Sequence, residues 1–173
     1  MLDTGSSMDT ETRKNQSPKQ QSGVRSFSWQ GLTRTCRTRL KPSGLPPDGK
    51  ILVDVTNVIG EGMTLAVGFS TSGAEELQKL IPKAHVVRAF NAVFAQNQST
   101  GHLDKEQLTL FVAGDDATAK QTLMRLGKDI GFDPVDAGPL RSARYLEPMA
   151  MQLINLGLVL GMGTKIGYKL VKG

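Results

Sequence analysis

The sequence is poor in the residue types that most disulfide and metal sites need. It contains one cysteine, Cys36, and two histidines, His85 and His102. A single cysteine cannot form an internal disulfide, which favours a reducing environment, and we therefore expect a cytoplasmic protein. The two histidines lack the spacing of metal ligands, so no metal site is predicted. No catalytic acid–base pair or activated nucleophile stands out either.

Long hydrophobic runs are also missing. The most apolar stretch, 149–162, has 14 residues and contains Gln152 and Asn155. A membrane-spanning helix needs about 20 such residues, so we predict no contact with a membrane. The N-terminus lacks the apolar segment of a secretory signal.

Acidic side chains are scarce at the start of the chain. The whole sequence has 21 Lys and Arg against 16 Asp and Glu, a net charge of +5. Residues 1–48 hold 8 of the basic and 4 of the acidic side chains, so the remainder is almost neutral. A charged tail supports only salt-sensitive, nonspecific contact with nucleic acid, and a specific nucleic-acid partner is not predicted.

The same first segment is poor in hydrophobic residues. Residues 1–47 contain no alanine and no isoleucine and are rich in Ser, Thr, Gln, Arg, Pro and Gly. Such a segment cannot bury enough apolar surface to offset the entropy of ordering it. We therefore predict a disordered basic leader at 1–47 and one globular domain at 48–173. The leader has the composition of an organelle transit peptide, but also that of low-complexity or misread coding sequence.

From residue 48 onward, short β-branched runs alternate with amphipathic segments. Strands are predicted at 50–55, 85–90, 108–113 and 132–137. The first helix begins at the capping box of Ser72 and Glu75, and the second begins at Asp115 or Asp116 and ends before Gly131. A third helical stretch follows residue 139, with its longer apolar half begun or kinked at proline 148. This order predicts an α/β fold with helices on the faces of a parallel sheet.

Ligands bind such sheets just beyond the carboxyl ends of the strands. The residues at those positions are Thr56, Asn57, Phe90, Asn91, Ala92, Val93, Gly114 and Asp115. Asparagines at two neighbouring strand ends can offer amide donors and acceptors to a planar ligand. The alternative is that asparagine and aspartate simply begin the turns that follow the strands, and their spacing leaves both interpretations open.

Six segments of the globular part carry a resemblance to a known family. They read GKILVDVTN (49–57), SGAEEL (72–77), VVRAFN (86–91), LFVAGDD (110–116), DAGPL (136–140) and RYLEP (144–148). Together they resemble the coenzyme F420-dependent NADP oxidoreductase family, to which the reductase domains of six-transmembrane metalloreductases are similar. The resemblance covers about residues 48–171 and matches the later part of a Rossmann-type fold.

The resemblance implies a domain that binds NADP(H) and passes hydride to or from coenzyme F420, a flavin or another small acceptor. It places the cofactor against Thr56, Asn57, Phe90 and Asn91. It places the second substrate against Val93, Phe94, Arg144, Tyr145 and Glu147. In this chemistry the cofactors carry the reaction and the protein holds the two rings together, so no catalytic side chain is assigned.

Two departures from the family pattern are present. The family often has proline after the first asparagine, where this sequence has Val58. The family also opens with a strand and a glycine-rich turn that hold the pyrophosphate, and residues 1–48 contain no G-x-G-x-x-G. The sequence thus predicts a truncated, impaired oxidoreductase with an exposed strand edge at 51–55, able to form homo-oligomers there or through its C-terminal helix. The alternative is a non-catalytic fragment or interaction module.

Overall fold

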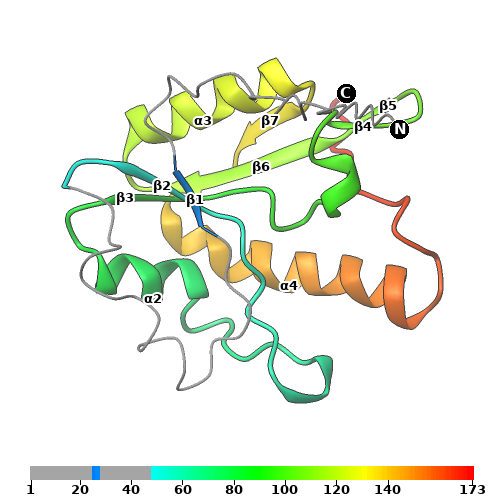
Figure 1. Cartoon of the computed structure of the whole chain (residues 1–173), viewed down its shortest axis with the longest axis horizontal. Helices are drawn as coiled ribbons and strands as arrows, with labels where there is room; N and C mark the ends of the chain where they lie inside the picture. The colour runs from blue at the N-terminus through cyan, green and yellow to red at the C-terminus, as the bar shows by residue number, and fades with distance from the viewer. Residues whose placement is uncertain (1–24, 28–47) are drawn as a thin grey trace, which may run out of the picture.

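The computed structural model describes residues 25–27 and 48–173, and the other residues of the predicted leader lie outside the described part. The central sheet has the strand order β1 (Arg25–Phe27), β2 (Ile51–Asp54), β3 (His85–Arg88), β6 (Thr109–Gly114) and β7 (Asp133–Asp136). Helix α3 (Ala117–Ile130) covers one face of the sheet, and α2 (Gly73–Leu80) and α4 (Ala143–Ile154) cover the other (Figure 1). The protein is therefore of the predicted α/β class, with a Rossmann-type arrangement of layers.

Short elements connect these layers. They are the 3-10 helices η2 (Glu61–Met63), η3 (Ala95–Asn97) and η4 (Leu140–Ser142), the hairpin of β4 (His102–Leu103) and β5 (Glu106–Gln107), and the π-helical η5 (Asn155–Val159). Segment η5 follows directly on α4, and Pro148 lies inside α4, so the helix itself begins before the proline. Across residues 25–27 and 48–173, every helix is too short or too polar to cross a membrane.

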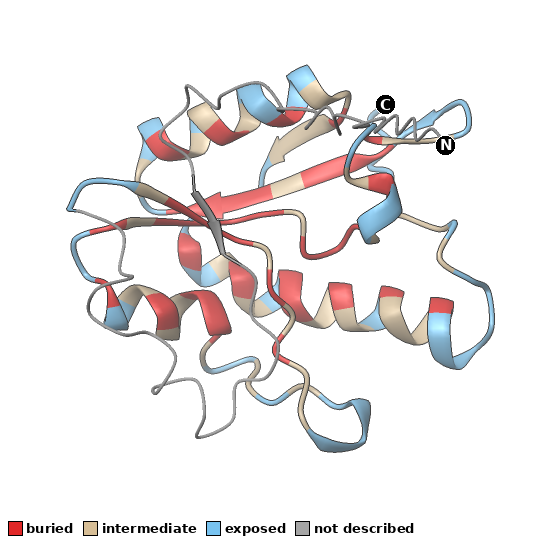
Figure 2. Cartoon of the chain, in the orientation of Figure 1, coloured by how far each residue is buried: buried red, intermediate tan, exposed pale blue. Residues whose placement is uncertain are grey.

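Side chains of the central strands alternate between two apolar layers. The layer under α3 includes Val53, Val87, Leu110, Leu123 and Phe132. The layer under α2 and α4 includes Leu52, Leu77, Ile81, Val86 and Ala143. Figure 2 shows the buried residues along the central strands and on the helix faces turned toward them. Burial on both faces explains why these strands read as nearly continuous apolar runs.

Both predicted helix starts are confirmed. The Ser72 hydroxyl accepts the Glu75 backbone N–H at 3.2 Å and donates to the Glu75 carboxylate at 2.8 Å. The Asp116 carboxylate accepts the Ala119 backbone N–H at 2.7 Å, so Asp116 caps α3. Helix α3 ends at Ile130 and is followed by Gly131, whose φ of 121° suits glycine.

The direction of β6 differs from the prediction of a parallel sheet. Strands β1, β2 and β3 are parallel, as are β6 and β7, but β6 runs antiparallel to β3, with Val87 opposite Gly114. The connection between β3 and β6 holds η3 and the β4–β5 hairpin, and a connection of this length can return the chain in either direction. As a result, Gly114 and Asp115 do not join Asn57 and Asn91 at one end of the sheet.

The predicted exposed edge of β2 is covered by another strand. Strand β1 pairs in parallel with β2, placing Arg25 beside Leu52 and Phe27 beside Asp54. Three residues of the predicted leader therefore belong to the sheet, which corrects the prediction of an unpaired edge at this position.

The opposite edge of the sheet is formed by β7, which contains Pro134. The backbone N–H groups of Asp133 and Ala137 donate to the carbonyls of Leu108 and Val112 at 2.9 and 2.7 Å. Because N–H directions alternate along a strand, residue 134 turns its nitrogen away from β6. Proline has no N–H to donate, and it is tolerated at such an outward position of an edge strand.

Candidate functional site

Strands β2 and β3 end side by side, and a polar turn follows each. The Asn57 side-chain Nδ2 donates to the backbone carbonyl of Asn91 at 3.0 Å. The Asn91 Nδ2 donates in turn to the Leu146 carbonyl of α4 at 2.8 Å. The two asparagines singled out in the sequence therefore meet at this end of the sheet, and both are fixed by hydrogen bonds.

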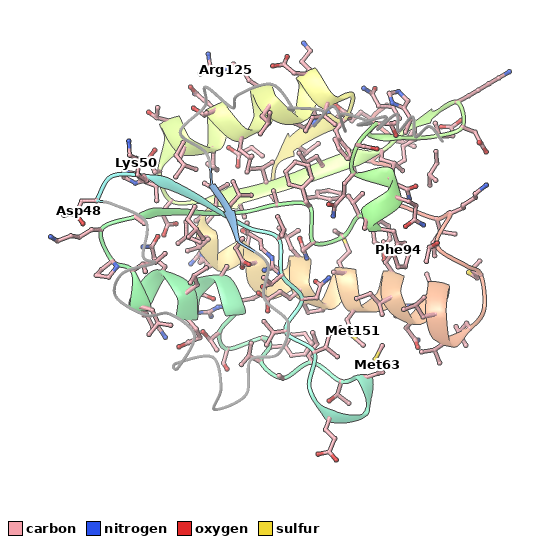
Figure 3. The ribbon with its side chains drawn as sticks, in the orientation of Figure 1. Asp48, Lys50, Met63, Phe94, Arg125 and Met151 are labelled. Atoms are coloured by element: carbon pink, nitrogen blue, oxygen red, sulfur yellow. The ribbon has the colours of Figure 1, made fainter. Side chains whose placement is uncertain are left out.

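A cavity of about 270 Å³ lies between these turns and α4. It is lined by Val55, Asn57, Phe90, Asn91, Val93, Phe94, Ala95, Gln98, Ala150, Leu153 and Ile154. None of these side chains is charged, and only three of them are polar. Figure 3 shows Phe94 between the η3 segment and α4. A mostly apolar cavity with a few converging amides is typical of a site for a small, flat ligand.

One polar atom of the cavity wall has no partner within the described residues. The Asn57 Oδ1 is buried and accepts no hydrogen bond, although the Nδ2 of the same amide is bonded to Asn91. Buried polar atoms in proteins are almost always paired. Asn57 therefore keeps one unused acceptor beside the cavity that it lines.

Backbone strain occurs at the same place. Phe90 has a φ of 62°, which is an outlier for a bulky residue. Its ring packs edge-on against Phe132, with the ring centroids 5.7 Å apart and the planes at 79°. Strain of this kind persists only where the surroundings hold it, and it is concentrated at ligand sites.

A buried ion network lies behind the two turns. Arg88, at the end of β3, donates through Nη1 to the Asp54 carboxylate at the end of β2. The same nitrogen lies 3.4 Å from the Thr56 hydroxyl, which itself donates to Asp54 at 2.8 Å. Arg88 Nη2 lies 3.5 Å from Glu147 Oε1 of α4. This network fixes the strand ends from which the cavity turns begin.

Sequence reasoning missed Asp54 and Arg88, although a signal was present. Each is a charged residue at the end of a mostly apolar strand, and the two occupy paired positions of β2 and β3. Charged side chains are almost never fully buried unless they are paired, so two such residues of opposite sign predict each other.

Glu147 caps the N-terminus of α2. Its carboxylate accepts the backbone N–H of Gly73 at 3.1 Å and that of Ala74 at 3.4 Å. Burial raises the pKa of Glu147, and the charge of Arg88 opposes that rise. The N-terminus of α2 is thus already occupied by a carboxylate of the same chain.

The residues predicted to contact the second substrate fall into two groups. Val93 and Phe94 line the cavity, whereas Arg144, Tyr145 and Glu147 do not. Tyr145 is 72% exposed on the outer face of α4. The predicted cofactor residues are also divided, because Asn57, Phe90 and Asn91 line the cavity but Thr56 belongs to the ion network. None of these predicted ligand contacts is tested by the geometry alone.

Arg144 forms an ion pair with α2. Its Nε and Nη2 donate to the two carboxylate oxygens of Glu75 at 2.9 and 2.7 Å. This bond lowers the pKa of Glu75 and raises that of Arg144.

Within residues 25–27 and 48–173, no group of three or more His, Cys, Asp and Glu is placed to hold a metal.

The fold and this cavity define a Rossmann-type α/β protein with an uncharged cavity beyond two parallel strands. A solved structure described as an F420-dependent NADP reductase from Arthrobacter sp. FB24 has this fold, with a TM-score of 0.72 and 30% identity. The match covers 80% of this chain and 65% of that one. The resemblance predicted from the six segments is thereby confirmed for part of the length of such reductases.

Metalloreductases are also similar in sequence. The chain is 37% identical to metalloreductase STEAP3 of Rattus norvegicus over 106 residues, which is 61% of this chain and 21% of the relative. It is 32% identical to metalloreductase STEAP2 of Homo sapiens over 108 residues, which is 62% of this chain and 21% of the relative. The chain thus spans about a fifth of the length of these curated relatives. No protein-family model matches it.

Proposed function

We propose that this chain is an NADP(H)-linked oxidoreductase whose cavity holds the nicotinamide end of the cofactor. The observation that carries the proposal is the buried Asn57 Oδ1, which lacks a partner within the described residues and belongs to a residue that lines an uncharged cavity. The carboxamide of a nicotinamide donates an N–H and carries no charge, so it matches this acceptor. The similarity to an F420-dependent NADP reductase supports the same assignment.

The residues of the cavity would divide the work of binding. Asn57 and Asn91 orient the carboxamide, and the Phe90 ring provides an apolar wall. When bound, NADP(H) supplies the hydride, and the protein contributes orientation and exclusion of water. Val93 and Phe94 would border the acceptor, for which coenzyme F420, a flavin or another small molecule are the candidates. The other three predicted contacts of the acceptor lie outside the cavity: Arg144, Tyr145 and Glu147. Only an acceptor that extends beyond the cavity would reach them.

The described residues fit the diphosphate of the cofactor less well than they fit its nicotinamide ring. Phosphate groups commonly bind free N–H groups at helix N-termini. Here Glu147 occupies those groups of α2, and Asp116 occupies the N-terminus of α3. Added phosphate would meet a carboxylate at both places, so affinity for the whole dinucleotide must come from residues beyond those described.

The occupation of both helix N-termini by carboxylates favours a second candidate function. A chain that holds only the ring end of the cofactor would act as a non-catalytic module that binds a small neutral ligand. The two candidates differ in the contribution that the phosphates make to affinity. An oxidoreductase that holds the whole cofactor binds NADPH much more tightly than reduced nicotinamide mononucleotide, whereas the module binds both alike.

Titration of the full chain with both ligands, followed by nicotinamide fluorescence, tests these candidates. We expect saturation with both, and a Kd for NADPH at least tenfold lower than that for the mononucleotide if the chain is the oxidoreductase. Equal millimolar affinities would favour the module. A lack of saturation by either ligand at millimolar concentration would overturn both. Anaerobic mixing of the NADPH complex with F420 or flavin mononucleotide then identifies the acceptor.

We also propose a cytoplasmic location and self-association through the end of the C-terminal helix. The location is supported by the single cysteine of the sequence. Self-association is supported by a patch of exposed apolar side chains at the end of η5, formed by Leu158, Val159, Leu160 and Met162. Contiguous exposed apolar residues are typical of interaction surfaces.

A further inference from the structure

Gln98 makes contacts that set it apart from the other polar residues of the cavity. Its side-chain Nε2 donates to the carbonyl of Val93 at 3.1 Å and lies 3.4 Å from the carbonyl of Phe90. The Phe90 carbonyl also accepts the backbone N–H of Val93 at 3.2 Å. One amide thus bonds to both ends of the turn that follows β3.

This turn is the strained part of the cavity wall. Phe90, its first residue, has a φ of 62°. A bulky side chain keeps a positive φ only when its surroundings prevent relaxation. Gln98 lies on the segment after η3, and its two bonds join that segment to the turn.

The turn that follows β3 also sets the orientation of the Asn57 side chain. The carbonyl of Asn91 lies inside the turn and accepts the Asn57 Nδ2 at 3.0 Å. A side-chain amide has a donor end and an acceptor end, so fixing Nδ2 also fixes the direction of Oδ1. If the turn relaxed, the Asn91 carbonyl would move and the Asn57 amide would be free to rotate.

We propose that Gln98 is a positioning residue that holds the Phe90–Val93 turn and thereby presents the Asn57 carbonyl oxygen to the ligand. The ligand is the neutral carboxamide-bearing ring of the proposed function, on which this inference rests. Gln98 touches the turn through its amide and does not need to contact the reacting atoms.

A pair of matched variants tests the proposal. Gln98→Met keeps the length and apolar packing of the side chain but removes both bonds to the turn. Gln96→Met is the control, because Gln96 is a glutamine two residues away whose Nε2 donates at 2.7 Å to Thr164 outside the cavity. We expect the Kd for reduced nicotinamide mononucleotide to rise about five- to tenfold in Gln98→Met and to stay within about twofold in Gln96→Met. Equal effects in the two variants, or no effect in either, would overturn the proposal.

A third variant gives a readout that general destabilisation would not produce. Gln98→Glu places a carboxylate against two carbonyl oxygens above the pKa of the new side chain, and a protonated acid able to donate one hydrogen bond below it. We expect the affinity of Gln98→Glu to recover toward that of the wild type as the pH falls through this pKa. A constant ratio of wild-type to variant affinity across the pH series would contradict the positioning role.

The proposal remains testable if the wild type binds none of the probes, an outcome that would refute the proposed function. In that case the side-chain amide signals of Asn57 in ¹⁵N NMR spectra test whether Gln98 positions Asn57. Loss of the hydrogen bond to Asn91 in Gln98→Met, seen as shifted and exchange-broadened Asn57 signals, would support positioning. Unchanged Asn57 signals in a folded Gln98→Met would overturn it.

Discussion

Asp54 and Arg88 lie opposite each other in register on two parallel strands and form an ion pair that water does not reach. Their exposed fractions are 1% and 0%. Two further nitrogens of the guanidinium, Nε and Nη2, lack a hydrogen-bond partner within the described residues. The Arg88 charge is thus held almost entirely by Asp54 and the more distant Glu147.

Removing Arg88 should destabilise the fold severely. Arg88→Met leaves two buried carboxylates without a cation, and breaking a buried pair in this way costs about 3–5 kcal/mol. Urea denaturation followed by circular dichroism measures the loss. Lys79→Met is the matched control, because Lys79 and its partner Glu76 are both exposed and such surface pairs contribute about 0–1 kcal/mol. Similar small losses in both variants would show that the buried network is not important for stability.

The stability of the protein should depend on the protonation of Glu147. Burial raises the pKa of Glu147 above the ordinary value of 4.5, so the folded state binds this proton more tightly than the unfolded state. The contribution of the group is therefore complete below pH 4.5 and is lost as the pH rises through the raised pKa.

Glu147→Gln removes this titration while keeping an oxygen for the α2 N-terminus. Urea denaturation at several pH values should show the wild type losing stability relative to the variant as the pH rises above 4.5. The comparison cancels Glu75 and Asp136, whose lowered pKa values act in the opposite direction in both proteins. A wild type that gains stability relative to the variant as the pH rises, or a difference between them that does not change with pH, would contradict the assignment.

Ligand affinity should depend on Asn57 more than on its neighbours. Asn57→Ala removes the acceptor and the bond to Asn91, and we expect the Kd for reduced nicotinamide mononucleotide to rise at least about tenfold. Asn97→Ala is the control, since that buried amide is directed at the Thr164 and Ile166 carbonyls and does not line the cavity. Equal affinities of the two variants for the ligand would show that Asn57 does not contribute to the binding site.

A single methyl group at Gly101 should destabilise the fold. Gly101 has a φ of 67°, and a Cβ there would lie 2.6 Å from backbone atoms of Gly131 and Phe132. The backbone strain alone costs about 1–3 kcal/mol, and the overlap adds to it. Gly101→Ala should thus lower the free energy of unfolding in urea, whereas Gly68→Ala, with ordinary contacts only, should not. Equal stabilities would indicate that the segment before β4 can shift freely.

Self-association should be sensitive to the exposed patch of η5. Leu160 is 64% exposed, and Leu160→Lys places a charge within this patch. If two copies associate there, size-exclusion chromatography should show a smaller species for this variant. Leu126→Lys, on α3 and away from the patch, should elute like the wild type. A wild type that elutes as a monomer would refute the proposed association.

Much of the fold was predictable because its signals are local. The capping box of Ser72, the cap of Asp116 and the glycine stop at 131 act within a few residues, and the structure shows all three. The apolar runs of the strands were equally clear, since each strand is buried on both faces. Local chemistry is visible in a single sequence because the interacting residues are neighbours along the chain.

The direction of β6 and the composition of the cavity were not predictable in the same way. Parallel and antiparallel pairing bury the same apolar run, so nothing in residues 109–114 distinguishes them. The α4 side of the cavity depends on how Ala150, Leu153 and Ile154 pack against two turns that are far away along the chain. Gln98 was missed because a single glutamine in a loop has no local pattern that distinguishes it from a surface residue.

Pro134 makes it harder for a further strand to pair with the β7 edge of the sheet. An incoming strand must find donors and acceptors along the edge it joins, and β7 lacks one outward donor and carries Asp133 and Asp136 besides. Strand addition by another polypeptide, including fibril-like stacking, is therefore disfavoured at β7. Recruitment of an extra strand would have to occur beyond β2, where displacing the three-residue β1 would open a position next to the candidate site.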